Sequence, residues 1–197
     1  MGHSFTDLIA LAALLLWPAI PLFWVPVHCA PRFFRRLGFL TYILPFLTWL
    51  PVAFITFGLR ENLLADRIAL PAIANALGVL LFVLGTGLQA WTIILLTMPG
   101  IMGMPEVTRA GPGRLVTAGP FGVLRHPTYL SHTLMLAGLF LWTETSALGA
   151  VAVIDALIVN AMVIPLEERE LLERFGKEYE EYRRKVPSRF LPLRRRR

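Results

Sequence analysis

The sequence predicts an all-α, polytopic integral membrane protein with about five transmembrane helices. Hydrophobic residues make up 56% of the 197 residues and charged residues only 16%, below the roughly one quarter of ordinary soluble domains. The apolar residues also form long blocks without charges, and a helix needs about 20 such residues to cross a bilayer. Most basic residues lie between or after these blocks, which is typical of membrane proteins.

Five apolar blocks are the candidate spans. The first three are long enough to cross a bilayer with some tilt. The last two are short and are separated by only four residues, so they predict a helical hairpin. The blocks cover residues 5–27, 39–59, 70–97, 128–142 and 146–165.

The positions of the basic residues predict the orientation. Seventeen of the 19 lysines and arginines lie in the first loop, in the third loop or after the fifth block. Because lysine and arginine favour the cytoplasmic side, we expect the N-terminus outside and the C-terminus inside. The net charge of +6 then reflects topology, so the expected partner is the lipid bilayer and not a nucleic acid.

A change in composition at Met98-Pro99-Gly100 divides the chain. We expect transmembrane helices one to three within residues 1–98, where no residue pattern indicates chemistry, and a second unit within residues 99–197. The second unit begins with about 28 residues rich in glycine and proline, and loops of this length are usually functional or disordered. Because proline favours the first turn of a helix, Pro127 is expected to open the fourth span.

Residues 166–185 predict a cytoplasmic amphipathic helix after the last span. Four glutamates crowd its first two turns, where the helix dipole favours negative charge. Apolar side chains recur at steps of three and four residues, so the helix lies either on the membrane or over the loop. The apolar positions are Leu171, Leu172, Phe175, Tyr179, Tyr182 and Val186.

Three segments of the second unit carry a resemblance to a known family. They are Gly113–Tyr129, which ends in an Arg-His-Pro-Thr-Tyr motif, the pair Glu167-Glu168, and Phe175-Gly176 with Tyr179 and Tyr182. At this spacing they resemble the isoprenylcysteine carboxyl methyltransferase family, which belongs with the membrane phospholipid methyltransferases. The resemblance implies that residues 99–197 are a methyltransferase-like core. It also implies S-adenosyl-L-methionine as the cofactor and a small lipophilic molecule or lipid as the methyl acceptor.

The resemblance also implies the site residues. It places cofactor-binding positions at Glu106, Arg114, Leu115, Val116, Phe121, His126, Tyr129 and Glu167. Of these, Glu167, His126 and Tyr129 are the candidate catalytic residues, because they suit the ammonium, carboxylate and ribose groups of the cofactor. Phe121 stands where the family commonly has tyrosine, so no hydroxyl contact is expected there. No metal site is expected, because the chain has one cysteine.

Three further residues are candidates for binding the acceptor: Val163, Asp155 and Arg169. The isoprenylcysteine enzymes have an arginine at the position of Val163, and an apolar side chain cannot pair with a carboxylate. Asp155 lies inside the fifth span, where an acid indicates function by default, with helix packing as the equal alternative. Arg169 lies one turn beyond the acid pair and could in principle reach back to a carboxylate. We therefore expect an amine or thiol acceptor in preference to a carboxylate.

Two other functions stay open. The Arg-His-Pro-x-Tyr motif also occurs in membrane sterol and steroid reductases, so an NADPH-dependent reductase is one alternative, although such enzymes are expected to have extra spans. The other is a non-catalytic membrane protein with the same fold. Binding of labelled S-adenosylmethionine or NADPH distinguishes the three.

Overall fold

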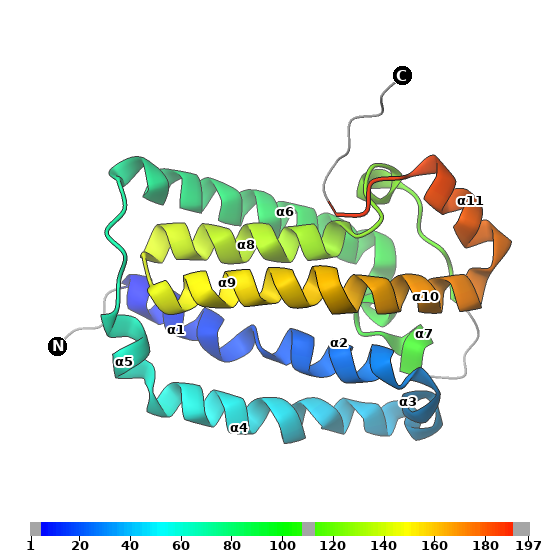
Figure 1. Ribbon diagram of the computed structural model, residues 1–197, viewed down its shortest axis with the longest axis horizontal. Helices are drawn as coiled ribbons and strands as arrows, with labels where there is room; N and C mark the ends of the chain where they lie inside the picture. The colour runs from blue at the N-terminus through cyan, green and yellow to red at the C-terminus, as the bar shows by residue number, and fades with distance from the viewer. Residues whose placement is uncertain (1–4, 108–112, 191–197) are drawn as a thin grey trace.

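The computed structural model describes residues 5–107 and 113–190, apart from the side chains of residues 105 and 106. Over these ranges the chain is helical, and its long helices run parallel or antiparallel along one long axis (Figure 1). The β pairing in this part of the chain is a single bridge between Arg67 and Thr145. The predicted all-α class is confirmed.

Residues 5–58 form two antiparallel rods (Figure 1). In the first rod, α1 (Phe5–Leu16) is followed by α2 (Ala19–Cys29), and they are separate helices because Pro18 cannot donate a backbone hydrogen bond. The second rod contains α3, a 3-10 turn η1 and α4, which packs against α1 and α2. Its elements are α3 (Pro31–Leu37), η1 (Gly38–Ile43) and α4 (Leu44–Gly58).

The short helix α5 (Arg60–Ala65) leads into α6 (Ala72–Ile101), which lies along α8 (Pro127–Thr143). Glycines allow these two helices to approach closely, as small residues do in membrane bundles. A Cβ atom added at Gly138 of α8 would lie 2.6 Å from the backbone nitrogen of Phe82 in α6.

The predicted loop after residue 98 contains short helical segments. Helix α6 extends to Ile101, and α7 (Met104–Val107) follows it at once. A 3-10 turn, η2 (Gly119–Gly122), precedes α8. The boundary between residues 98 and 99 therefore falls inside α6, and a division of the chain at this point stays a prediction.

The predicted hairpin of α8 and α9 (Ser146–Ile158) is present. Glu144 adopts the left-handed conformation with φ 59° and ends α8. The turn is fixed from outside, because Arg67 donates to the carbonyl oxygen of Thr143 at 2.9 Å. The two helices then pack side by side (Figure 1).

The predicted C-terminal helix differs from the observed one. Helix α9 continues through a π-helical turn, η3 (Val159–Val163), into α10 (Ile164–Phe175), so residue 166 begins no new helix. The actual break comes at Gly176, where a φ of 52° suits a residue without a Cβ atom. Helix α11 (Lys177–Lys185) then turns back over the end of the bundle (Figure 1).

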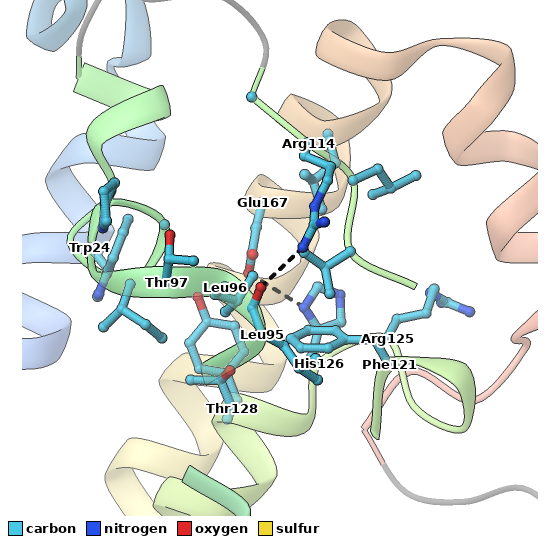
Figure 2. A pocket seen from close by; sticks show the side chains of 18 of the residues that line it. Trp24, Leu95, Leu96, Thr97, Arg114, Phe121, Arg125, His126, Thr128 and Glu167 are labelled. Atoms are coloured by element: carbon cyan, nitrogen blue, oxygen red, sulfur yellow. Dashed lines mark hydrogen bonds and ion pairs between the residues drawn. The ribbon is translucent and has the colours of Figure 1, made fainter. Parts of the chain in front are cut away.

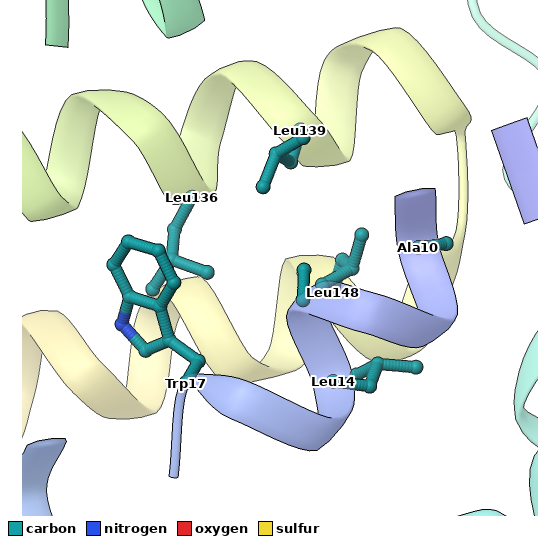
Figure 3. Packing of buried hydrophobic residues seen from close by; sticks show 7 residues of the cluster. Ala10, Leu14, Trp17, Leu136, Leu139 and Leu148 are labelled. Atoms are coloured by element: carbon teal, nitrogen blue, oxygen red, sulfur yellow. The ribbon is translucent and has the colours of Figure 1, made fainter. Parts of the chain in front are cut away.

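The main hydrophobic core joins α1 to the hairpin. Trp17 and the α1 side chains before it pack against leucines of α8 and α9 (Figure 3). The buried members are Ala10, Ala13, Leu14, Trp17, Leu136, Leu139 and Leu148. This packing places the N-terminal rod against the second unit and fixes α2 beside α10.

The outer faces of the bundle are apolar. Phe54, Ile73 and Ile94 are exposed by 82%, 75% and 74%, and such a surface suits lipid and not water. Within the part of the chain that the structure describes, four helical stretches are long and apolar enough to cross a membrane: Phe5–Cys29, Pro31–Gly58, Ala72–Ile101 and Ser146–Phe175. The predicted span 128–142 corresponds to α8, which has 17 residues, so the count of five crossings stays a prediction.

Candidate functional site

A cavity of about 740 Å³ lies where α2, α6 and α10 end and α8 begins. Its wall includes residues from both halves of the chain, from Ile20 in α2 to Tyr182 in α11. A volume of this size is typical of sites for drug-sized ligands. Figure 2 shows the labelled side chains converging on this space from α2, α6, α8, α10 and the segment before α8.

The start of α8 is held in place by the segment after α11. The backbone N–H groups of Arg125 and His126 donate to the carbonyl oxygens of Ser188 and Arg189, at 3.0 and 3.1 Å. The Arg125 guanidinium donates to two further carbonyl oxygens of the same segment, at 2.7 and 2.8 Å. These bonds fix the backbone from which the His126 side chain enters the cavity wall.

Glu168 is the buried centre of an ion-pair network. One carboxylate oxygen accepts from Arg125 Nε at 2.8 Å and lies 3.3 Å from His126 Nε2, and the other accepts from Arg189 at 2.7 Å. The side chain is only 6% exposed. Glu168 was expected near the start of a separate helix, but the continuous α9–α10 rod buries it where arginines neutralise it.

Glu167 faces His126 across the cavity wall (Figure 2). The Glu167 Oε2 atom lies 3.4 Å from His126 Nδ1, and the ring of Tyr129 stacks on the imidazole with 5.9 Å between centroids. Burial lowers the pKa of His126, but the Glu167 and Glu168 carboxylates outweigh it and raise the pKa above its ordinary value. The two carboxylates therefore favour the protonated form of His126.

The segment before α8 is tied to helices on both sides. Arg114 donates to the carbonyl oxygen of Leu95 in α6 at 3.4 Å. The Tyr182 hydroxyl of α11 donates to the carbonyl oxygen of Phe121 at 2.8 Å. Burial raises the pKa of Tyr182, so the hydroxyl keeps the proton that it donates. Phe121, which lacks a hydroxyl, thus contributes a backbone acceptor here.

Helix α6 is interrupted at the cavity. Thr97 has φ 63° and ψ 165°, a combination that residues other than glycine rarely adopt and that is found mostly at functional sites. Thr97 lines the cavity with Leu95 and Leu96 before it and Pro99 after it (Figure 2). The interruption brings backbone groups of α6 to the wall opposite Glu167.

The structure brings most of the sequence-predicted cofactor residues together. Seven of them line the cavity: Arg114, Leu115, Val116, Phe121, His126, Tyr129 and Glu167. The eighth, Glu106, has a side chain outside the described part of the structure.

The three candidate acceptor-binding residues do not line the cavity. Val163 is 2% exposed and packs with Tyr129 and Ile164, one turn deeper in the bundle than Glu167. Asp155 is buried against Trp17. The Arg169 side chain is 79% exposed and pairs with Glu173 at 3.5 Å, so it points away from the site.

Several cavity residues were not predicted from the sequence. Trp24 and His28 of α2 and Gln89 of α6 line the wall, although the first half was expected to contain no chemistry. Arg174 near the end of α10 also lines it. Arg174 is therefore a cation at the cavity wall, whereas a role of Arg169 in binding the acceptor stays a prediction. The available signal was the periodicity of α10, where Arg174 falls seven residues after Glu167.

Within the described ranges, no group of three or more histidine, cysteine, aspartate or glutamate side chains could hold a metal ion. The described wall contains carboxylate, imidazole and guanidinium groups.

A family model described as phospholipid methyltransferase matches residues 73–178. This region contains α6, α8, α9, α10 and most of the cavity wall. No solved structure matches the chain.

Curated proteins are similar in sequence to parts of the chain. The chain is 38% identical over 76 residues to the cobalt-zinc-cadmium resistance protein CzcN of Cupriavidus metallidurans, covering 39% of this chain and 35% of that protein. It is 29% identical over 113 residues to protein-S-isoprenylcysteine O-methyltransferase B of Arabidopsis thaliana, covering 56% of each. It is 28% identical over 98 residues to the Delta(14)-sterol reductase TM7SF2 of Mus musculus, covering 48% of this chain and 23% of that protein. The matches therefore span less than two thirds of each relative.

Proposed function

We propose, since the chain belongs to the phospholipid methyltransferase family, that it transfers a methyl group from S-adenosyl-L-methionine to a lipophilic acceptor in the membrane. The observation that carries the proposal is the cavity in which Glu167, His126 and Arg114 meet at one end of an apolar bundle. Each of these residues belongs to a segment that resembles the methyltransferases.

The cavity residues fit this cofactor. The cofactor carries an ammonium and a sulfonium, which suit the Glu167 carboxylate, and a carboxylate, which suits Arg114 or protonated His126. Leu95, Leu171 and other apolar wall residues suit the adenine ring. When bound, S-adenosylmethionine supplies an electrophilic methyl group.

The protein's own contribution is to align the reacting atoms and to exclude water. Methyl transfer is an in-line displacement, and holding the reactants in line contributes several kcal/mol to such a reaction. Tyr182 and Arg114 tie the segment over the cavity to α11 and α6, and the tyrosines, leucines and Phe175 of the wall keep the site poor in water.

The acceptor enters from the apolar side of the cavity in this proposal. Ile20 and Trp24 of α2 and Leu96 of α6 line that side, and such residues favour a molecule dissolved in the bilayer. Val163 lies outside the wall, so it does not select against a carboxylate by contact. A carboxylate, an amine and a thiol are therefore all chemically compatible with the wall residues.

The proposed orientation puts the cavity on the cytoplasmic side. The basic stretch around Arg35, the segment before α8 and helix α11 gather at the same end of the bundle (Figure 1), as the positive-inside rule requires. Single cysteines that replace Arg35 or Lys185 should react with a membrane-impermeant maleimide only after the membrane has been permeabilised to expose its cytoplasmic face. Labelling of the two positions from opposite faces would contradict the proposed topology.

The test of the function is cofactor binding by the purified protein. We expect labelled S-adenosylmethionine to bind stoichiometrically and S-adenosylhomocysteine to displace it. The similarity to a sterol reductase makes NADPH the informative competitor. Binding of NADPH without binding of S-adenosylmethionine would replace the proposal by the reductase, and binding of neither would leave a non-catalytic membrane protein.

A further inference from the structure

A second polar pair reaches the cavity from the half of the chain in which no chemistry was predicted. His28 lies near the end of α2, is 5% exposed and lines the cavity. Its ring stacks on Trp24 with 5.1 Å between centroids and an interplanar angle of 17°. This stacking limits the rotation of the imidazole, which belongs to a residue of the cavity wall.

One ring edge of His28 contacts a buried carboxylate. His28 Nδ1 lies 3.0 Å from Oε2 of Glu170, which is 4% exposed. The second Glu170 oxygen lies 3.5 Å from the Arg35 guanidinium, so the carboxylate is held between the imidazole and a cation. A carboxylate in this position requires a proton on Nδ1, so the neutral imidazole has its lone pair on Nε2.

A carboxylate that orients a histidine through one nitrogen, while the other nitrogen faces a ligand, is the arrangement of a general base. Glu167 also lies near His28, close enough for a direct electrostatic interaction. Glu167, which is proposed to hold the cofactor, and His28 both line the cavity, and Glu170 contacts the imidazole at 3.0 Å.

We propose that His28 is the general base of the reaction and that Glu170 is its positioning residue. The inference rests on the proposed function. In this step the acceptor atom forms a bond to the methyl carbon, and the bond between that carbon and sulfur breaks with its electron pair remaining on sulfur. The proton of the acceptor moves to His28 Nε2, and Glu170 stabilises the resulting imidazolium.

The pair also narrows the acceptor class. A carboxylic acid has already lost its proton at neutral pH, with an ordinary pKa near 4, so it gains nothing from a base. A thiol, a phenol or an alkylammonium group retains a proton on the nucleophilic atom at neutral pH. The acceptor is therefore a lipophile with one of these groups.

The first test detects proton transfer without turnover. A dodecyl-substituted nitrophenol is added to protein saturated with S-adenosylhomocysteine, about one pH unit below the pKa of the probe in detergent. We expect the visible absorption of the phenolate to increase when the probe binds to the wild type without any addition. With His28→Ala, we expect the increase only when imidazole is added. Equal phenolate absorption in wild type and His28→Ala without imidazole, or no increase in the wild type, would overturn the inference.

The second test compares acceptors of equal chain length: dodecanethiol, dodecylamine and dodecanoic acid. His28→Asn keeps a donor near the Nδ1 position but has no base, so kcat for the thiol or the amine should fall by about 10²–10⁴. Glu170→Gln should lower kcat by roughly tenfold without changing KM, and Glu173→Gln, an exposed position on the same helix, should behave as the wild type. A preference for dodecanoic acid, or unchanged thiol and amine kcat in His28→Asn, would overturn the inference.

Binding of S-adenosylhomocysteine separates the two proposals. We expect the dissociation constants of the wild type and the His28 variants to agree within about threefold, a difference below 1 kcal/mol, which also shows that the variants fold. Absence of binding in the wild type would defeat the proposed function. Intact binding with phenolate formation independent of His28 would defeat only the proposed base.

Discussion

Glu168→Ala tests the network that positions the site. The carboxylate accepts short hydrogen bonds from Arg125 at 2.8 Å and Arg189 at 2.7 Å. The two arginines are not equivalent, because the side chain of Arg125 is 9% exposed and that of Arg189 is 43% exposed. Removal of the carboxylate therefore leaves one buried cation and one largely hydrated cation.

The expected loss of unfolding free energy follows from this difference in exposure between the two arginines. Breaking a buried ion pair from one side costs about 3–5 kcal/mol, whereas an exposed pair contributes roughly 0–1 kcal/mol. We expect Glu168→Ala to lower the free energy of unfolding by about 3–5 kcal/mol, most of it through the buried Arg125 and His126 side chains. Arg189→Ala should cost at most about 1 kcal/mol.

The assay is reversible unfolding in detergent, followed by tryptophan fluorescence. A double-mutant cycle of Arg125→Ala and Glu168→Ala should give a coupling energy of about 2–3 kcal/mol, and the cycle with Arg189→Ala should give less than 1 kcal/mol. If Glu168→Ala changed the unfolding free energy by less than about 1 kcal/mol, the network would not be what holds the start of α8.

Three further predictions concern the cavity and the bundle. Glu167→Ala should weaken S-adenosylmethionine binding by more than the ~1 kcal/mol of a surface charge, and an unchanged dissociation constant in equilibrium dialysis would remove Glu167 from the site. The pKa of His126 is raised in the folded state. Protonated His126 should therefore contribute fully to the free energy of unfolding below about pH 6.5, and this contribution should be lost as the pH rises through the pKa of His126 in the folded protein. Unfolding curves of His126→Asn should lack this loss, and equal pH profiles would contradict the assigned charge. Gly138→Ala should destabilise the α6–α8 contact by about 1–3 kcal/mol, since the added Cβ would meet the Phe82 backbone at 2.6 Å, whereas Gly87→Ala, with nothing within 4 Å, should be neutral or stabilising.

The features that the sequence predicted correctly are encoded locally. The fold class follows from long apolar blocks, and the α8–α9 hairpin follows from two such blocks separated by four residues. The binding of a cofactor stays a prediction, but seven residues proposed for it lie in one cavity, because His126, Tyr129 and Glu167 belong to segments that the hairpin brings together. A sequence pattern is enough to predict which segments meet in space when only a short turn connects the helices that carry them.

The features that the sequence did not predict depend on distant contacts. His28 and Glu170 are 142 residues apart, and α2 contains no motif that indicates their meeting. Glu170 is one of the four glutamates that the sequence places in the first two turns of the amphipathic helix, but in the structure it is buried against His28 of α2. Val163 was placed at the acceptor site from its spacing to Glu167, but the ring of Tyr129 packs against it, so a position one turn away on the same helix does not share the cavity.

The central claim is tested most directly by methyl transfer in the membrane where the protein is made. Membranes containing the wild type or Glu167→Gln are incubated with methyl-labelled S-adenosylmethionine, and the label is counted in the organic extract. We expect label in the lipophilic fraction of the wild-type membranes, and a loss of about 10²-fold or more in the variant if Glu167 contributes about 3 kcal/mol to positioning the cofactor. Wild-type membranes that incorporate no more label than membranes without the protein would contradict the account.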